Sequence, residues 1–235
     1  MLPLKDNIPT RTFPIVTVAI IVANALVWLL WEHAGSGQAF QSSVVDGSYR
    51  PCEVVSECRQ VGQGWVANVF TSMFMHGSWE HIIGNMLFLW IFGNNVEDTI
   101  GKFRFVAFYL LAGIAATAVQ TFVTLNFAPE RDAGIPNLGA SGAIAGVLGA
   151  YILLYPGGRV LTLLLPFFIF ELPAFLYLGI WFLFQLVTGG SSFTHPEEGG
   201  GVAYFAHIGG FVFGLLTVKL FSAGRPPKVP TPRWA

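Results

Sequence analysis

The sequence predicts an all-α fold, a polytopic membrane protein built as a bundle of six transmembrane helices. Of the 235 residues, 54% are hydrophobic and only 11% are charged, whereas about a quarter of the residues in a soluble domain are charged. Several stretches without charge are long enough to cross a bilayer. The charged residues gather between these stretches, as they do in membrane proteins with several spans.

The first span is expected at residues 13–31, a stretch that contains no charged residue. A cleaved signal peptide is the competing interpretation, because Ala23-Asn24-Ala25 has the small-residue pattern of a cleavage site. That pattern lies inside the apolar stretch, which favours a retained helix. The other spans are expected at residues 81–97, 105–127, 138–155, 173–188 and 202–221, within one membrane domain that covers residues 1–222.

The connections between the spans are expected to lack regular structure. Residues 33–64 are predicted to form a long loop that contains the only two cysteines, Cys52 and Cys58. In an oxidising compartment these two thiols could form a disulfide, but spacing alone leaves both states open. The other connections are expected to be interfacial or irregular at 160–172, flexible at 189–201 and a disordered tail at 223–235.

The basic residues predict the orientation of the chain. With six spans both termini lie on one side, and nine of the 12 lysines and arginines fall on that side. Both termini are therefore expected in the cytoplasm, with the protein in a bacterial inner (plasma) membrane. The second, fourth and sixth spans would then run in the same direction, from the outside inwards.

The polar residues of these three parallel spans are expected at one depth. Ser141 lies at the start of the fourth span, in a run that otherwise holds only glycine and apolar residues. A packing serine is the ordinary interpretation of such a hydroxyl. However, His81 and Asn85 share one face at the start of the second span, and His207 lies near the start of the sixth. Ionisable groups inside a bilayer indicate a functional site.

Small residues predict close contact between the fourth and sixth spans. Gly210 and Gly214 are four residues apart and lie on the same face as His207. A glycine pair with this spacing lets two helices approach closely. The matching small residues of the fourth span are Gly142, Gly146 and Ala150. The contact would bring His207 beside Ser141.

A serine beside a histidine is the smallest activated nucleophile. His207 would take the hydroxyl proton of Ser141 and later give it to the leaving amine. No carboxylate lies at that depth, where an additional charge would be costly to bury. The backbone N–H of Ser141, the amide of Asn85 and the imidazole of His81 could stabilise the oxyanion of the tetrahedral intermediate.

At these residues the sequence resembles the rhomboid family of intramembrane serine proteases. The resemblance covers nearly the whole chain and rests on His76-x4-His81-x3-Asn85, Gly139-Ala140-Ser141-Gly142, Gly93-Asn94-Asn95-Val96-Glu97 and Ala206-His207 followed by Gly210-x-x-x-Gly214. It implies Ser141 as nucleophile, His207 as general base, and His81 and Asn85 as oxyanion partners. It also implies hydrolysis of peptide bonds in or near the transmembrane segments of other membrane proteins.

The sequence departs from the family pattern at two places. Some members carry a tyrosine four residues after the serine, stacked on the catalytic imidazole, and here that position is Ala145. What supports the ring of His207 is therefore open. Some members also carry a Trp-Arg pair in the first loop, which by position would fall on Ala67-Asn68.

Other functions fit the sequence less well. A metal site could use His76, His81 and His207, but no His-Glu-x-x-His motif is present. The Gly-x-Ser-x-Gly elbow of soluble hydrolases, the paired halves of a transporter and the basic patch of a nucleic-acid-binding protein are also missing. A non-catalytic relative that binds transmembrane clients is the main alternative. The expected partners are transmembrane substrates and the lipid bilayer, and neither a cofactor nor a metal is expected.

Overall fold

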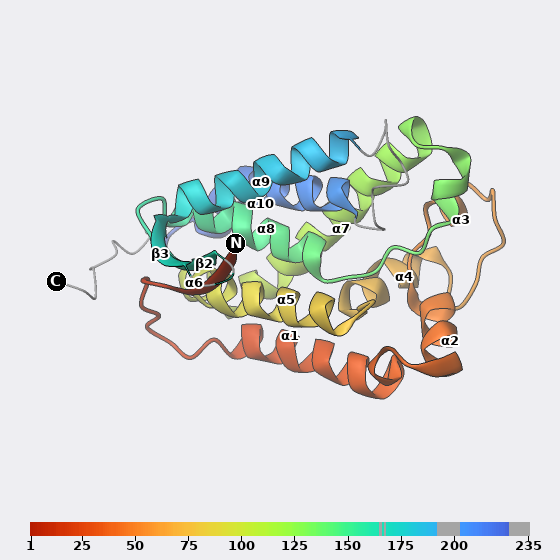
Figure 1. Ribbon diagram of the computed structural model, residues 1–235, viewed down its shortest axis with the longest axis horizontal. Coiled ribbons are helices and arrows are strands. Elements are labelled where there is room, and N and C mark those ends of the chain that lie inside the picture. Colours follow the sequence, from red (N-terminus) through yellow and green to blue (C-terminus); the bar gives the residue numbers. More distant parts are fainter. Residues whose placement is uncertain (165, 167, 192–202, 226–235) are drawn as a thin grey trace.

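The computed structural model describes residues 1–164, 166, 168–191 and 203–225. Most of these residues are helical, and the long helices lie side by side along one direction (Figure 1). A small sheet lies at one end of this bundle, and short helices lie at the other end (Figure 1).

Helical segments occupy each of the six ranges expected to span the membrane. They are α1 (Ile15–Leu26), continued by a π-helical turn (Val27–Trp31); α5 (Trp79–Phe88), continued by a π-helical turn (Leu89–Gly93) and α6 (Asn94–Ile100); α7 (Lys102–Phe127); α8 (Ser141–Leu154); α9 (Ala174–Ser191); and α10 (Tyr204–Phe221). Among the described residues, α7, α9 and α10 are long and apolar enough to cross a membrane. Residues 15–31 and α8 are apolar but shorter. The chain is a mostly helical membrane protein, and the count of six spans stays a prediction.

Helix α8 forms the centre of the core. Every residue from Gly142 to Tyr151 is buried, and α5, α7, α9 and α10 pack around this helix. A helix that is covered on all sides has no face for polar residues, which explains why α8 is apolar all round. Its many glycines and alanines leave room for neighbouring backbones to come near.

The predicted contact between the fourth and sixth spans is confirmed in the contact between α8 and α10. A Cβ atom added to Gly210 would lie only 2.0 Å from the carbonyl oxygen of Gly142. A Cβ atom added to Gly214 would lie 2.0 Å from the carbonyl oxygen of Gly146. The two backbones therefore touch directly, and no side chain fits between them at these positions.

The N-terminus of α1 is capped by a carboxylate that is distant in the sequence. Glu97, in α6, accepts hydrogen bonds from the backbone N–H of Val16 at 3.1 Å and of Thr17 at 2.7 Å. It also accepts one from the Thr17 hydroxyl at 2.7 Å. A carboxylate at this position pairs with N–H groups that have no partner within their own helix and complements the helix dipole. The contact fixes the N-terminus of α1 to α6.

The all-α prediction is wrong at one end of the bundle, where three strands form an antiparallel sheet. They are β1 (Leu2–Asp6), β2 (Arg159–Leu164) and β3 (Phe168–Pro173), in the order β1-β2-β3. Residues 160–172 were expected to be interfacial or irregular, yet most of them pair in the β2–β3 hairpin. Val160 and Thr162 are fully buried, and a β-branched residue at every second position suits a strand with one covered face.

A buried carboxylate connects this sheet to the central helix. The Oδ2 atom of Asp6 accepts hydrogen bonds from the amide of Asn95 and from the hydroxyl of Tyr151, both at 2.6 Å. Burial raises the pKa of Asp6 from its ordinary value of 3.8 to about 7, and the hydrogen bond from Tyr151 opposes this rise. The carboxylate of Asp6 thus connects β1 to α8. Its negative charge is costly to bury at this position.

The long loop expected at residues 33–64 is also partly helical. It contains α2 (Gly37–Gly47) and α3 (Pro51–Val54), and the next segment contains α4 (Trp65–Thr71). Short 3-10 turns lie at His33–Gly35, Ser72–Phe74 and Glu130–Gly134. Tertiary contact accounts for the difference, because Gly47 packs against the ring of Trp31 and the sulfur of Met75. The segment is polar and has only a weak local tendency to form helices, so these helices depend on packing that the sequence alone does not show.

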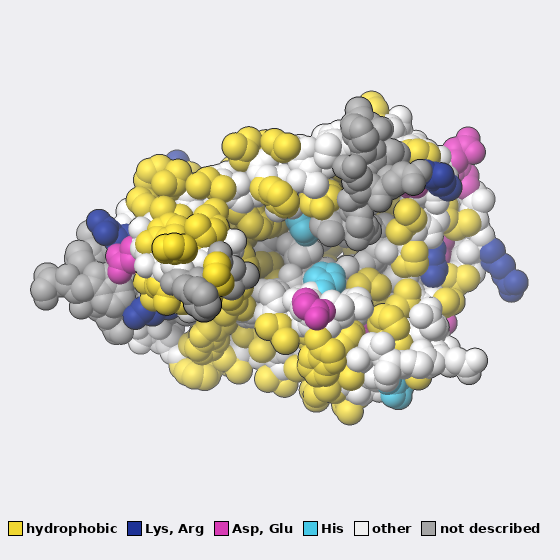
Figure 2. Space-filling view, viewed as in Figure 1, with side chains coloured by type: hydrophobic (Ala, Val, Ile, Leu, Met, Phe, Trp, Pro, Cys, Tyr) yellow, Lys and Arg dark blue, Asp and Glu magenta, His cyan; other side chains and the backbone are white. Residues whose placement is uncertain are grey.

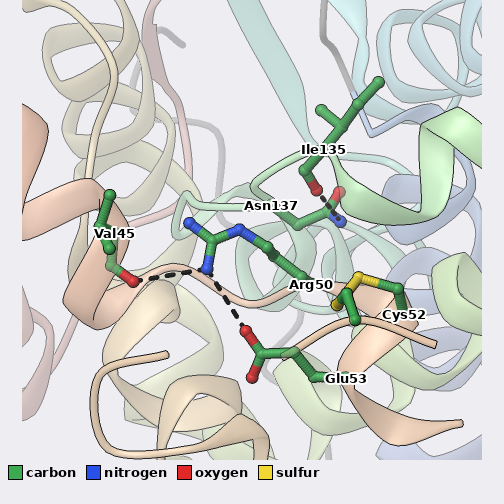
Figure 3. Close-up of a disulfide and its surroundings, with 7 residues drawn as sticks. Val45, Arg50, Cys52, Glu53, Ile135 and Asn137 are labelled. Carbon is green, nitrogen blue, oxygen red and sulfur yellow. Dashed lines mark hydrogen bonds and ion pairs between the residues drawn. A yellow bond between two sulfur atoms is a disulfide. The ribbon is translucent and has the colours of Figure 1, made fainter. Parts of the chain in front are cut away.

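Cys52 and Cys58 form a disulfide, with their Cα atoms 5.5 Å apart. Next to it, the guanidinium of Arg50 donates to the carbonyl oxygen of Val45 at 3.4 Å and lies 3.3 Å from the carboxylate of Glu53 (Figure 3). The neighbouring backbone is held by the pairing of Tyr49 with Asn137. These contacts fasten the loop between α2 and α4 to the segment that leads into α8.

Two predicted irregular segments lie mostly outside the described residues. Helix α9 continues to Ser191, so the first residues of the loop expected at 189–201 are helical, and residues 192–201 are not described. Of the tail expected at 223–235, only the first three residues are described, and they form a turn. Arg104 donates to the carbonyl oxygens of Phe221 and Ala223, both at 2.9 Å.

We predict that Gly214→Ala lowers the melting temperature of the purified protein. The added methyl group would meet the Gly146 carbonyl, and forced overpacking of this kind costs about 1–3 kcal/mol. The matched control is Gly179→Ala on α9, where an added Cβ atom has no atom within 4 Å. The control should melt at the wild-type temperature or slightly higher, because alanine favours a helix more than glycine does. Equal melting of both variants would contradict the backbone contact.

We also predict that Asp6 makes a contribution to stability that is lost as the pH rises through the range in which its carboxyl group titrates. The pKa of Asp6 is raised to about 7 in the fold, so between its ordinary value and 7 the folded chain retains a proton that the unfolded chain has lost. The contribution of Asp6 to the free energy of unfolding is therefore largest at low pH and decreases towards neutrality. Asp6→Asn should remove this contribution. Melting curves at pH 5 and pH 8 test it, with Asp46→Asn at an exposed carboxylate as control. A wild-type pH profile that runs parallel to that of Asp6→Asn would refute the prediction.

Candidate active site

Ser141 is the first residue of α8. The preceding Gly139 has a φ of 135° and donates its N–H to the carbonyl oxygen of Ser72 at 2.8 Å. This φ favours glycine, and here glycine is also needed for space. A Cβ atom at position 139 would lie 2.8 Å from two atoms of the His81 ring. Gly139 therefore lets that imidazole lie directly against the backbone beside Ser141.

The structure brings Ser141 and His207 together. The Nε2 atom of His207, on α10, lies 2.8 Å from the hydroxyl oxygen of Ser141. The direct contact of α8 with α10 produces this geometry, because Gly142 follows the serine and Gly210 lies one turn after the histidine. A distance of 2.8 Å is that of a hydrogen bond between a hydroxyl and a ring nitrogen.

The other nitrogen of His207 also has a partner. Its Nδ1 atom lies 2.8 Å from the amide oxygen of Gln185, on α9. The amide nitrogen of Gln185 donates to the Trp181 carbonyl at 3.4 Å, which is consistent with the oxygen facing the ring. An oxygen can only accept, so Nδ1 carries the proton and Nε2 presents its lone pair to Ser141. The imidazole is thus in the form that accepts a hydroxyl proton.

Asn85, on α5, is oriented by a second histidine. Its Nδ2 atom lies 3.0 Å from Nε2 of His76, and burial lowers the pKa of His76 to about 3, with His81 nearby as a smaller cause. His76 is therefore neutral and accepts one of the two N–H bonds of the amide. The second N–H of the amide remains available on the cavity side.

His76 is in turn held by an acidic residue after the first helix. Both carboxylate oxygens of Glu32 accept from the backbone N–H of His76 at 3.0 Å. Burial raises the pKa of Glu32 to about 7, and the hydrogen bond from His76 acts in the opposite direction. Glu32 thus ties the turn before α5 to the C-terminal end of the first helical segment.

His81 lies in the first turn of α5, where Ser78 caps the helix by accepting from the His81 N–H at 3.2 Å. Its Nδ1 atom accepts from the N–H of Gly77 at 3.4 Å. The ring proton is therefore on Nε2, on the edge that faces Gly139. His81 thus offers a donor beside the start of α8.

Ser141, His207, His81 and Asn85 line one cavity of about 680 Å³. Apolar side chains form much of its remaining wall, among them Phe88, Ile144, Leu148 and Trp181. The space-filling view shows a hollow at the centre of this face, with histidine side chains at its wall and apolar side chains around it (Figure 2). The hollow thus combines an apolar wall with one cluster of polar groups, as ligand sites do.

The positions of the three histidines can be compared with the metal site that the sequence left possible. The rings of His76 and His81 lie against each other, with centroids 5.1 Å apart. Within the described parts of the chain, no group of three or more His, Cys, Asp or Glu side chains is arranged to hold a metal ion. His76 and His207 instead use ring nitrogens in hydrogen bonds to Asn85 and Ser141.

Sequence analysis missed three residues of this site. Gln185 and Trp181 support His207 from α9, and Glu32 supports His76. Gln185 could have been suspected, because it is the one amide within the apolar stretch 174–187. Trp181 offered no such signal, since tryptophans are common near membrane surfaces. Glu32 directly follows the first apolar span, where an exposed charge is the usual interpretation.

Comparison with known proteins agrees with the family resemblance seen in the sequence. A family model described as "Rhomboid domain" matches residues 62–224. The presenilin-associated rhomboid-like protein, mitochondrial, of Rattus norvegicus is 30% identical over 200 residues, which cover 83% of this chain and 46% of that protein. Rhomboid protein 1, mitochondrial, of Saccharomyces cerevisiae is 31% identical over 149 residues, covering 63% of this chain and 40% of that protein.

Rhomboid-like protein 11, chloroplastic, of Arabidopsis thaliana is 30% identical over 156 residues, which cover 65% of this chain and 51% of that protein. This chain thus spans about half the length of the curated relatives that it matches.

Proposed function

Because this chain belongs to the rhomboid family, we propose that it is an intramembrane serine endopeptidase. Its reaction is the hydrolysis of peptide bonds in or near the transmembrane segments of membrane proteins. The observation that carries the proposal is the 2.8 Å contact between the Ser141 hydroxyl and Nε2 of His207, on an imidazole whose other nitrogen is already occupied by Gln185.

The proposed mechanism begins with proton transfer from Ser141 to Nε2 of His207 as the serine oxygen attacks the peptide carbonyl carbon. The carbonyl oxygen becomes an oxyanion, which the backbone N–H of Ser141, Nε2–H of His81 and the free N–H of Asn85 stabilise. His207 then gives its proton to the leaving amine, and an acyl ester remains on Ser141. Water, deprotonated by His207, hydrolyses this ester and regenerates the serine.

The site lies where a transmembrane substrate could reach it. The cavity is lined on one side by α5 and on the other by α8, α9 and α10, and much of its wall is apolar. An unwound segment of a substrate helix could place its backbone near Ser141 while its apolar side chains stay in an apolar environment. The proposed partners are therefore transmembrane proteins and the surrounding lipid, and the proposed chemistry needs no cofactor.

The proposal includes six spans with both termini on the cytoplasmic side of a bacterial plasma membrane. The excess of lysine and arginine at that end supports the orientation. The relatives named above are described as mitochondrial or chloroplastic. The active-site cavity would then open towards the outer leaflet.

The catalytic proposal predicts unequal losses of activity. Ser141→Ala should abolish cleavage of a transmembrane substrate, and His207→Ala should nearly do so, because an unassisted serine is a poor nucleophile. The double variant should be no worse, since the two groups act as one unit. Asn85→Ala should lose roughly 10²-fold in rate, because other oxyanion donors remain. The measurement is the initial cleavage rate in liposomes.

Labelling by a serine-directed fluorophosphonate gives an independent measure. The wild-type protein should be labelled, and Ser141→Ala should not be. Ser42→Ala, at an exposed serine of α2, is the matched control and should cleave and label normally. Full activity in Ser141→Ala would refute the serine mechanism. A folded wild-type protein that binds transmembrane segments but neither cleaves nor labels would instead support the non-catalytic alternative.

The orientation predicts the behaviour of reporters fused after Ala235. A reporter that requires the cytoplasm should be active there, and a reporter that requires the external compartment should be inactive. The reason is the concentration of basic residues at the ends of the chain and in the turns on the same side. The opposite pattern would reverse the orientation and direct the cavity to the cytoplasmic leaflet.

A further inference from the structure

Gln185 is a buried amide on a helix whose neighbouring side chains face outwards. Leu183, Phe184 and Val187 are 58%, 60% and 63% exposed, whereas Gln185 is only 5% exposed. A buried amide without partners would be costly at this position, because no water is available in the hydrocarbon layer to replace its hydrogen bonds. Its contacts therefore indicate why a polar residue stands there.

Both polar atoms of this amide have partners, and the partners define one orientation. The oxygen lies 2.8 Å from Nδ1 of His207, and the nitrogen donates within α9 to the Trp181 carbonyl. With the oxygen on Nδ1, the proton of the imidazole is held at Nδ1, and the lone pair of Nε2 faces Ser141. An amide can perform this role without adding a charge to the apolar interior.

Trp181 adds a second contact from the same helix. It lies four residues before Gln185 and therefore on the same face of α9. Its ring centroid is 5.8 Å from that of His207, with an angle of 37° between the planes. Some members of the family carry a tyrosine at the position of Ala145. Here the alanine contributes no ring to stack on the imidazole. Support for the imidazole thus comes from α9.

We propose that Gln185 is a positioning residue that holds His207 in the tautomer and orientation required for proton transfer from Ser141. The proposal rests on the serine-protease function proposed above. It also makes the packing of α9 a condition for catalysis, because α9 carries both the hydrogen-bond acceptor and the adjoining ring. If α9 moved away from α10, the imidazole would lose both contacts while the pairing of α8 with α10 stayed unchanged.

The test compares Gln185→Met, which keeps the length of the side chain but removes the acceptor, with Gln185→Glu, which keeps an acceptor oxygen. For the full chain in liposomes, Gln185→Met should lower kcat by about 10–10²-fold with KM close to the wild-type value. Its rate of fluorophosphonate labelling should fall by a similar factor, because labelling needs the dyad but no peptide substrate. Gln185→Glu should recover most of both rates. Leu186→Met, at the exposed neighbouring position, should behave as the wild type.

Three outcomes would overturn the proposal while leaving the serine mechanism intact. One is a Gln185→Met variant with wild-type kcat and labelling. Another is an equal loss in the Met and Glu variants together with a lowered melting temperature, which would indicate packing alone. If Gln185→Met does not fold, Gln185→Asn replaces it, because the shorter side chain of asparagine cannot reach His207. The third overturning outcome is then wild-type labelling by folded Gln185→Asn, whereas slow labelling by that folded variant supports the proposal. Activity in Ser141→Ala would refute the proposed function itself.

Discussion

The direct backbone contact between α8 and α10 is the constraint on which the rest of the structure depends. At Gly210 and Gly214 an added Cβ atom would lie 2.0 Å from a carbonyl oxygen of α8, so the distance between the two helices is set by main-chain atoms. Backbone atoms cannot adopt other rotamers, and the distance is therefore fixed more firmly than side-chain packing would fix it. Ser141 and His207 lie next to this contact, so the distance between their backbones is fixed by the same main-chain atoms. The remaining helices enclose the pair, and α8 becomes the buried centre of the bundle.

The polar groups of the site are held by a series of contacts that each cross between segments. His207 on α10 meets Gln185 on α9, Asn85 on α5 meets His76, and Glu32 after the first helix accepts from the His76 backbone. In an apolar interior each of these groups needs a partner, and each partner also restricts the orientation of the group. The residues that satisfy the buried polar atoms are thus the residues that define the geometry of the cavity.

The four polar residues that meet at the cavity could be predicted from the sequence, whereas their supports could not. Ser141, His207, His81 and Asn85 lie near the starts of three apolar spans that were expected to run in one direction, and this direction predicted that they would come together. The pairing of Gly210 and Gly214 with α8 followed from the spacing of small residues. Gln185 and Glu32 depend on the rotation of α9 and on the path of the chain after the first helix, which no periodic pattern specifies. The β2–β3 hairpin was missed because an apolar run with prolines also fits a disordered interfacial segment, and only pairing with Leu2–Asp6 distinguishes the two.

That pairing has a consequence for the assembly of the chain during synthesis. Strand β1 is made long before its partner β2, which begins at Arg159, and the Tyr151 hydroxyl that bonds to Asp6 lies in the fourth of the six expected spans. The N-terminal strand therefore has no partner strand until β2 has left the ribosome, although its Asp6 can already bond to Asn95. Its pairing with β2 completes the sheet at one end of a bundle whose earlier helices have already been made. A probe attached to β1 would thus register the synthesis of a hairpin that follows the central helix.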